Sequence, residues 1–337
     1  MTKTNQQKVK DFLINNGVII VMFILVIYTG FTSDNFFTKN NFMNILMNMS
    51  SRLVIALGIA GCVITAGCDL SAGRMIGFGA CISGMLLQRM DYSGKFFPDM
   101  QPLNVFVVAL IAMLVCAAFG TVTGFFIAYL NVPPFIATLA MMEIVYGIGL
   151  IVTNATPLGG YVEQYTNVSN GKFLGINYLI WIAIIVAAIT WFIFNMTRHG
   201  KYMYAIGGNP QAAEVAGVPV KATLILIYMK AAAMYGLAGF MLGAKAGGAS
   251  VQTGYGYEME AIAACTIGGV SVTGGRGKVS SAIIGVAVFE LLKVALQYLG
   301  MNANAQYIAI GVVIFIAISL DIRKYIEIGR ASCRERV

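Results

Sequence analysis

Four charged residues lie inside apolar runs of the sequence: Glu143, Lys230, Glu290 and Lys293. Ionisable side chains at membrane depth are functional candidates by default. Glu290 and Lys293 have i, i+3 spacing, so they can share a helix face and neutralise each other. Lys230 lies one or two turns into its run and can extend its ammonium group to the cytoplasmic surface. A proton relay needs several converging acids, and Glu143 is the one acid left unpaired, so proton coupling is the weaker interpretation.

The sequence offers little from which to build a catalytic or metal site. His199 is the single histidine and is predicted to lie in a basic cytoplasmic loop, so we expect neither a His-centred catalytic triad nor a metal site with several histidines. The stretch 274–280 is like a phosphate loop, but that motif requires G-x-x-x-x-G-K-[ST]. Val272 and Val279 occupy the positions of its first glycine and its hydroxyl residue. We therefore expect no catalytic residue, no metal, no cofactor and no ATP hydrolysis by this chain, and interpret 274–280 as a Gly-rich cytoplasmic turn.

A second group of polar residues could belong to a path through the membrane. Asn44 and Asn48 interrupt an apolar run early, and Asp69 and Ser71 lie in the turn that precedes the next run. Either Asp69 or Ser71 can cap the helix that follows. A role as helix cap explains the presence of Asp69 and Ser71 as well as a role in the translocation path does. The candidates for a translocation path or for gating are Asn44, Asn48, Asp69, Ser71 and Glu143.

The segment 198–221 predicts a short helix outside the membrane. Asn209 is a good N-cap, Pro210 suits the first helical position, and Gly217 can end the helix in the left-handed conformation. An isolated helix that exposes Ala and Val favours a groove on another protein. The alternative, a helix lying flat on lipid, favours larger apolar anchors. The residues expected to dock are Gly208, Asn209, Pro210, Gln211, Ala212, Ala213, Glu214 and Gly217.

The composition is that of a membrane protein. Of the 337 residues, 58% are hydrophobic and 11% are charged, whereas soluble domains carry about 25% charged residues. The surplus apolar side chains must therefore face lipid. The net charge of +8 comes from residues scattered in short loops, which is typical of membrane topology and does not indicate nucleic-acid binding.

Ten segments are candidate transmembrane helices, because about 20 mainly apolar residues are needed to cross the hydrocarbon core. The second is interrupted by polar residues, and the third and eighth are short. Without the second and eighth, the fold would be an all-α bundle of eight helices. The candidates are 13–30, 42–66, 75–90, 103–130, 134–153, 176–196, 222–244, 259–272, 280–300 and 305–321.

The distribution of basic residues predicts that both termini are cytoplasmic. With this orientation, eleven Lys and Arg residues fall on the cytoplasmic side and six on the outer side, including Arg52 and Lys245. Glu258 and Glu260 are then expected in outer loops. We predict one membrane domain over 1–325, with a retained first helix. The tail 326–337 is atypical and reads as a sequencing or cloning scar.

Several strings of the chain resemble the permease subunits of bacterial ABC sugar importers, in the ribose, galactose and xylose branch. The likeness covers 12–325 and is greatest to the galactose/methyl-galactoside members. The strings that carry it are Ala205–Val218, Gly67–Arg74, Ala128–Leu139, Ala261–Ser271, Ala56–Gly61 and Tyr257–Cys265.

The resemblance implies the ABC-importer permease fold and an assembly. Two permease copies would form the pathway in the inner membrane, an ABC ATPase subunit would bind beneath, and a periplasmic or lipid-anchored sugar-binding protein would deliver substrate. The 209–217 helix would be the coupling helix, on which ATP-driven closure of the ATPase pushes. The cargo would be galactose, methyl galactoside or glucose, with ribose and xylose as further candidates. The alternative is a secondary transporter or channel without an ATPase, whereas an intramembrane enzyme lacks a nucleophile–base pair.

Overall fold

The computed structural model describes residues 20, 22–33, 35–302, 304–316 and 319, and these are mainly helical. Two short apolar helices, Met22–Thr32 and Asn304–Ile316, lie near the ends of the described chain. Between them run α2 (Lys39–Ile64), α3 (Ala72–Leu86), α4 (Val105–Tyr129), α5 (Pro134–Thr153), α6 (Glu163–Asn170), β1 (Lys172–Phe173), β2 (Ile176–Asn177), α7 (Tyr178–Met196), α8 (Arg198–Gly208), α9 (Pro210–Val215), α10 (Val220–Ala246), α11 (Tyr257–Gly268) and α12 (Val279–Tyr298).

Six helices of the described chain are long and apolar enough to cross a membrane: α2, α4, α5, α7, α10 and α12. The expected count of ten is therefore not confirmed. The second expected span, 42–66, is present in spite of its polar residues, because α2 is one unbroken helix of 26 residues. The eighth span is the 12-residue helix α11. The expected spans 13–30 and 305–321 extend beyond the described residues, as do the termini and the tail 326–337.

Helix α2 runs through the centre of the bundle. Within its most apolar window, 78% of the residues are buried, whereas the corresponding share is 22% for α4 and for α7. Side chains such as Phe106 and Leu114 on α4, or Ile185 and Phe192 on α7, lie exposed along the outer helices. Large apolar side chains that are exposed along a whole helix face are those that contact lipid. Thus α4 and α7 are outer helices, of which α7 packs on α2 and α4 packs on α10.

Close packing of α10 on α3 explains part of the glycine content. A Cβ on Gly239 would lie 2.2 Å from the Ile76 carbonyl oxygen and 2.7 Å from the Ala80 nitrogen. On the same face, Gly79 lies against Gly236. Small residues allow helix backbones to approach closely in lipid, where apolar burial alone does not drive association. These glycines fix the spacing of two helices that carry candidate residues.

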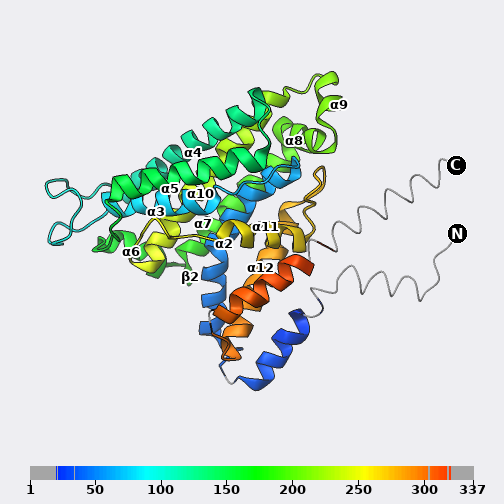
Figure 1. Ribbon diagram of the computed structural model, residues 1–337. Coiled ribbons are helices and arrows are strands. Elements are labelled where there is room, and N and C mark those ends of the chain that lie inside the picture. The colour runs from blue at the N-terminus through cyan, green and yellow to red at the C-terminus, as the bar shows by residue number, and fades with distance from the viewer. Residues whose placement is uncertain (1–19, 21, 34, 303, 317–318, 320–337) are drawn as a thin grey trace.

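The connections gather at two opposite ends of the bundle (Figure 1), with α8 and α9 at one end and α6 and the β1–β2 hairpin at the other. At the α6 end, single antiparallel bridges join Gln88 to Tyr161 and Leu158 to Ala249. At the α8 end, Gly275 N–H donates to the carbonyl of Ile64, the last residue of α2, at 2.8 Å. Hydrogen bonds thus fix the connecting segments at both ends of the bundle, and the candidate residues lie between these ends.

Candidate functional site

A short exposed helix, α9, lies where the sequence predicts it. The Asn209 side chain accepts a hydrogen bond from the Ala212 N–H at 3.0 Å and so caps the helix. At the other end Gly217, with φ of +83°, donates to the Glu214 carbonyl at 3.0 Å. The N–H of Val218 donates to the carbonyl of Ala213 at 3.0 Å. This paired arrangement satisfies the free carbonyls of the last turn, so the sequence specifies both ends of α9 locally.

The outward face of α9 differs from the expectation. Ala213 is 5% exposed and packs inside the chain, whereas Val215 is 91% exposed. Ala212 and Glu214 are also exposed. The helix is not isolated, because it follows and packs against α8, a helix of 11 residues that the sequence analysis missed. The surface available to a partner is therefore Ala212, Glu214 and Val215 with Gln211, and Ala213 anchors α9 from beneath.

The Gly-rich turn after α11 supports α8. The Tyr204 hydroxyl on α8 donates to the Gly277 carbonyl at 2.8 Å. A Cβ on Gly207 would lie 1.8 Å from the Ile64 carbonyl oxygen and 2.5 Å from the Gly275 nitrogen. The turn therefore holds α8 against the end of α2. Its position between α11 and α12 agrees with the interpretation as a connecting turn.

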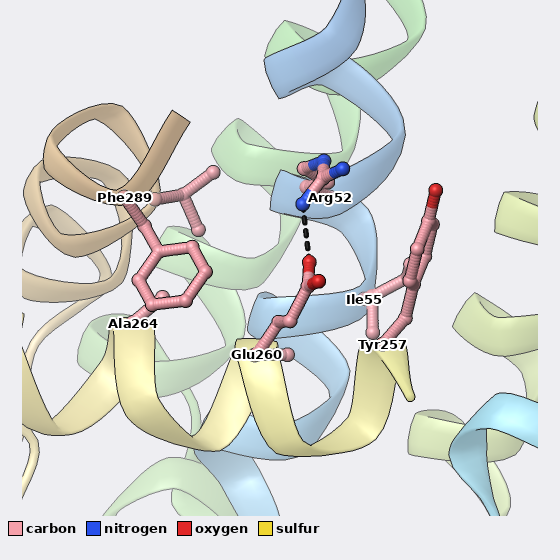
Figure 2. Close-up of a pocket in the computed structure, with 8 residues that line it drawn as sticks. Arg52, Ile55, Tyr257, Glu260, Ala264 and Phe289 are labelled. Carbon is pink, nitrogen blue, oxygen red and sulfur yellow. Dashed lines mark hydrogen bonds and ion pairs between the residues drawn. The ribbon is translucent and has the colours of Figure 1, made fainter. Parts of the chain in front are cut away.

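A largely buried cluster of four charges, in which Glu290 is fully buried, joins α2, α11 and α12. Arg52 forms ion pairs with Glu260 and with Glu290, and Lys293 forms one with Glu260. Figure 2 shows the Arg52 and Glu260 side chains pointing toward each other from α2 and α11. The expected local pair of Glu290 and Lys293 is wrong, because each has its ion-pair partner on another helix. Two positive and two negative charges make the cluster neutral, which limits the cost of burying it.

This arrangement also corrects the assignment of Arg52 and Glu260 to outer loops. Arg52 lies near the middle of α2, and Glu260 lies in the first turn of α11. The guanidinium carbon of Arg52 lies 4.8 Å from the centre of the Tyr257 ring, a favourable cation–π position. The cavity beside them measures about 10 Å³ and is lined by Arg52, Ile55, Tyr257, Glu260, Ala261, Ala264, Val286 and Phe289. It is close to the smallest space that holds one water molecule.

A larger cleft contains two of the candidate path residues, Asn44 and Asn48. It has a volume of about 540 Å³ and lies between the first half of α2 and the last turns of α10 and α12. The Lys245 ammonium donates to the Asn48 carboxamide oxygen. The lining residues are Asn41, Asn44, Ile45, Met47, Asn48, Lys245, Val294, Gln297 and Tyr298. Amide, ammonium and phenol groups together offer both donors and acceptors to a polar solute.

The other candidates lie elsewhere. Asp69 is 2% exposed, and its carboxylate accepts hydrogen bonds from the Ser71 N–H at 3.0 Å and the Ser71 hydroxyl at 2.6 Å. This local turn precedes α3, but Ser71 at the N-cap makes no capping hydrogen bond with its side chain, so the capping interpretation is not confirmed. Glu143 lies near the middle of α5 with an exposed side chain and has no ion pair within the described part of the chain. The structure thus brings Asn44 and Asn48 together but not Asp69, Ser71 and Glu143 with them.

Comparison with known proteins decides the family. A profile described as "Branched-chain amino acid transport system / permease component" matches residues 41–318. The chain belongs to this permease family. Near-full-length relatives agree with the resemblance noted from the sequence, which is thereby confirmed. Together with the six apolar helices, the family makes this chain a multi-pass membrane protein.

The relatives of the permease are named for sugar import. It is 39% identical over 332 residues to the galactose/methyl galactoside import permease protein MglC of Escherichia coli K12, covering 96% of this chain and 99% of the relative. The protein of that name from Haemophilus influenzae is 40% identical, with the same coverage. The ribose import permease protein RbsC of Escherichia coli K12 is 32% identical, covering 94% of this chain and 96% of the relative. No solved structure matches at a significant level.

His199 is a partly buried residue of α8 in the permease, whereas the sequence had suggested a loop. It lines a cavity between α8 and α10 together with Lys230. Burial and, secondarily, the Lys230 ammonium lower the pKa of the His199 imidazole to about 4. The imidazole is therefore neutral at physiological pH. Lys230 lies beside the α8 end of the bundle, as expected for a lysine that extends toward that surface.

Proposed function

We propose that this permease is the transmembrane subunit of an ATP-driven importer that moves a monosaccharide across the bacterial inner membrane. The observation that carries this proposal is the near-full-length identity with import permeases named for galactose and methyl galactoside. Galactose, methyl galactoside and glucose are the preferred cargoes, with ribose as a further candidate because a ribose import permease is also similar. The chain itself hydrolyses no ATP in this proposal, since its Gly274–Ser280 turn departs from the P-loop motif.

The proposed partners are an ABC ATPase, a periplasmic or lipid-anchored sugar-binding protein, and a second copy of the permease. Helix α9, with Gly208 and Asn209 before it and Gly217 after it, is the proposed ATPase contact. Its support is the outward Val215, an apolar side chain exposed at a solvent end of the bundle. An exposed apolar residue beside Ala212 fits a shallow groove on a protein partner better than water. Movement of this contact would pass to α2 through the Gly207–Ile64 packing.

The proposed orientation places both termini and the α8–α9 end in the cytoplasm. It rests on the excess of basic residues predicted for the cytoplasmic side, which remains when Arg52, in the middle of α2, is left out of the outer count. The cleft with Asn44 and Asn48 then opens toward the outer half of the membrane, because α2 begins there. We assign Asn44 and Asn48 to the polar path, and Glu143 to a surface that faces the path or the second copy. Asp69 and Ser71 support the path by fixing the start of α3.

Co-purification of an ATPase with the tagged permease tests the central claim. Replacing Ala212 with Arg should retain membrane insertion but weaken ATPase binding, because a charge cannot enter an apolar groove unpaired. A penalty of about 2 kcal/mol corresponds to a roughly thirtyfold loss of affinity. The matched control is Gln164→Arg, which places the same charge on an exposed position of α6 at the opposite end. Ala213→Arg is a poorer test because Ala213 is buried within the chain.

Uptake of radiolabelled galactose and ribose, measured in the same cells, completes the test. Wild-type permease should import galactose only when the ATPase is present, and Ala212→Arg should abolish import at a normal permease level. Import that continues without any ATPase would indicate a secondary transporter or channel. Normal ATPase binding and uptake by Ala212→Arg would remove α9 as the coupling element.

A further inference from the structure

A polar and aromatic group of side chains lies outside the cleft described above, on a face formed by α3, α5 and the segment 249–256. The Arg74 guanidinium carbon lies 4.0 Å from the centre of the Tyr146 ring and 4.5 Å from the centre of the Tyr255 ring. Both distances lie within the range of a cation–π interaction. We call Arg74, Tyr146, Gln252 and Tyr255 the Arg74 cluster.

Hydrogen bonds hold the Arg74 cluster in one arrangement. An Arg74 terminal nitrogen donates to the Gln252 carboxamide oxygen at 2.8 Å. The Gln252 amide nitrogen in turn donates to the Tyr146 hydroxyl at 3.1 Å. Gln252 is exposed, and the Tyr255 ring is 62% exposed. The cluster thus presents an ordered planar amide and an open aromatic ring at the surface.

Two buried atoms beside the cluster lack hydrogen-bond partners within the described residues. One is the Arg74 Nε, and the other is the Oε2 of Glu258. Glu258 is 6% exposed, and its carboxylate lies against Gly73, where a Cβ would approach Oε2 to 2.0 Å. Buried polar groups are normally paired, so each exception needs an explanation. Because both atoms are enclosed, a buried water molecule beneath the cluster is the partner that would satisfy them.

The surface around the Arg74 cluster is unlike the lipid-facing surfaces of the protein. Glu143 lies three residues before Tyr146 on α5, near the middle of that membrane-length helix, with an exposed side chain. Helix α5 also exposes the apolar side chains of Leu139 and Ile144 beside Glu143, so the charge of Glu143 is what distinguishes this face from the exposed faces of α4 and α7. A charged side chain at the centre of a bilayer is costly unless it faces water or protein. The α5 face with Glu143 and Tyr146 is therefore expected to border water or a partner copy instead of lipid.

We propose that the exposed side of the Arg74 cluster is a binding site for a monosaccharide on its way through the membrane. This inference rests on the proposed function. A sugar ring has flat C–H faces, which can stack on an aromatic ring such as Tyr255. Its hydroxyls both donate and accept, so they can pair with the Gln252 amide and the Arg74 guanidinium. The site would hold sugar transiently, since it is open and shallow.

The first experiment compares sugar uptake with ATP turnover in the complete importer reconstituted in proteoliposomes. Replacing Tyr255 or Gln252 with Leu should lower galactose uptake by about tenfold, because hydroxyls or a sugar face lose their partner. ATP hydrolysis stimulated by the loaded sugar-binding protein should persist. Tyr255→Phe, which keeps the ring, should lose less than about threefold. The matched control Gln164→Leu alters an exposed glutamine on α6 and should transport like the wild type.

Either of two results would overturn the assignment. Uptake at the wild-type rate by both Leu variants would show that sugar does not use the Arg74 cluster. Parallel loss of uptake and ATP hydrolysis would show that the cluster only maintains the structure. The proposed function fails separately, if the wild-type importer moves neither galactose nor ribose.

A labelling experiment tests the site without relying on transport rates. A cysteine at Tyr255 should react with a water-soluble maleimide in the reconstituted importer, and millimolar galactose should slow the reaction. Leu110→Cys, on the apolar exposed face of α4, should stay unlabelled. The parent protein carries Cys333→Ser, because Cys333 lies outside the described residues; of the other cysteines, Cys62, Cys81, Cys116 and Cys265 are buried and Cys68 is partly so. Labelling of Tyr255→Cys that galactose leaves unchanged, or no labelling at all, would contradict a sugar site.

Discussion

The Arg52 Nε lies 2.9 Å from the Glu290 Oε2, and this ion pair joins the middle of α2 to the middle of α12. Glu260 bridges Arg52 and Lys293, so the neutral cluster also ties in α11. Breaking a buried pair is costly because one charge remains uncompensated, whereas removing both partners can cost little. The cluster therefore connects three helices without adding net charge. Replacing one charged residue should reduce the stability of the fold more than replacing an oppositely charged pair.

The charge cluster predicts a large difference between two variants. Glu290→Gln should destabilise the fold by about 3–5 kcal/mol, because it leaves an excess buried positive charge. The double variant Arg52→Met with Glu290→Met should be milder, since the Glu260–Lys293 pair stays intact. Thermal unfolding of the purified permease in detergent measures both. Asp91→Asn is the control, because its pair with Arg89 is exposed at 3.6 Å and should contribute less than about 1 kcal/mol. Equal effects at Glu290 and Asp91 would mean that the cluster is not stabilising.

Close packing of α10 on α3 predicts a position-specific effect of one methyl group. Gly239→Ala should destabilise by about 1–3 kcal/mol, because the added Cβ meets backbone atoms of α3 that cannot rotate away. Gly311→Ala is the matched control, since a Cβ at Gly311 meets no atom within 4 Å. The measurement is again thermal unfolding in detergent. Similar melting temperatures for the two variants would show that α3 and α10 can move apart freely.

The orientation proposed from the basic residues can be read with reporter fusions. A fusion after Lys221, at the start of α10, should behave as cytoplasmic. A fusion near Gly160, at the opposite end of the bundle, should behave as external. Alkaline phosphatase and a fluorescent protein give opposite signals on the two sides, so each position has an internal check. The reversed pattern would put α9 outside the cell and remove it as an ATPase contact.

Helix ends could be predicted from the sequence, whereas ion-pair partners that are distant in the sequence could not. The cap at Asn209 and the left-handed Gly217 depend on neighbouring residues alone, so the ends of α9 were predictable. The partner of Glu290 was not, because Lys293 is near in sequence but Arg52 reaches it only after α2 and α12 pack. For the same reason, the burial of Ala213 depends on packing against α8, and no pattern in the sequence of α9 predicts this burial.

Two helices form although their sequences favour them only weakly. Asn48 and Arg52 lie inside the second apolar span, yet α2 is continuous, because Lys245 pairs with Asn48 and Glu290 pairs with Arg52. Helix α8 forms where the sequence predicts a loop, since Arg198, His199 and Gly200 open it with polar and small residues. The Thr197 hydroxyl caps it by accepting from the Gly200 N–H at 3.2 Å. Tertiary packing then stabilises a helix that local propensity alone does not favour.

The last prediction concerns pH and the single histidine. The pKa of His199 is lowered to about 4 in the folded permease, by burial and then by the Lys230 ammonium, whereas an unfolded histidine titrates near about 6.5. Between these values the unfolded chain binds a proton that the folded chain does not. The free energy of unfolding therefore falls as pH drops from about 7 toward about 4, and the contribution levels off below that. His199→Gln lacks this titration, so the wild-type melting temperature should fall more than that of the variant between pH 7.5 and pH 5.0. Parallel curves for the two proteins over this range would show that His199 titrates normally and is not buried against α10.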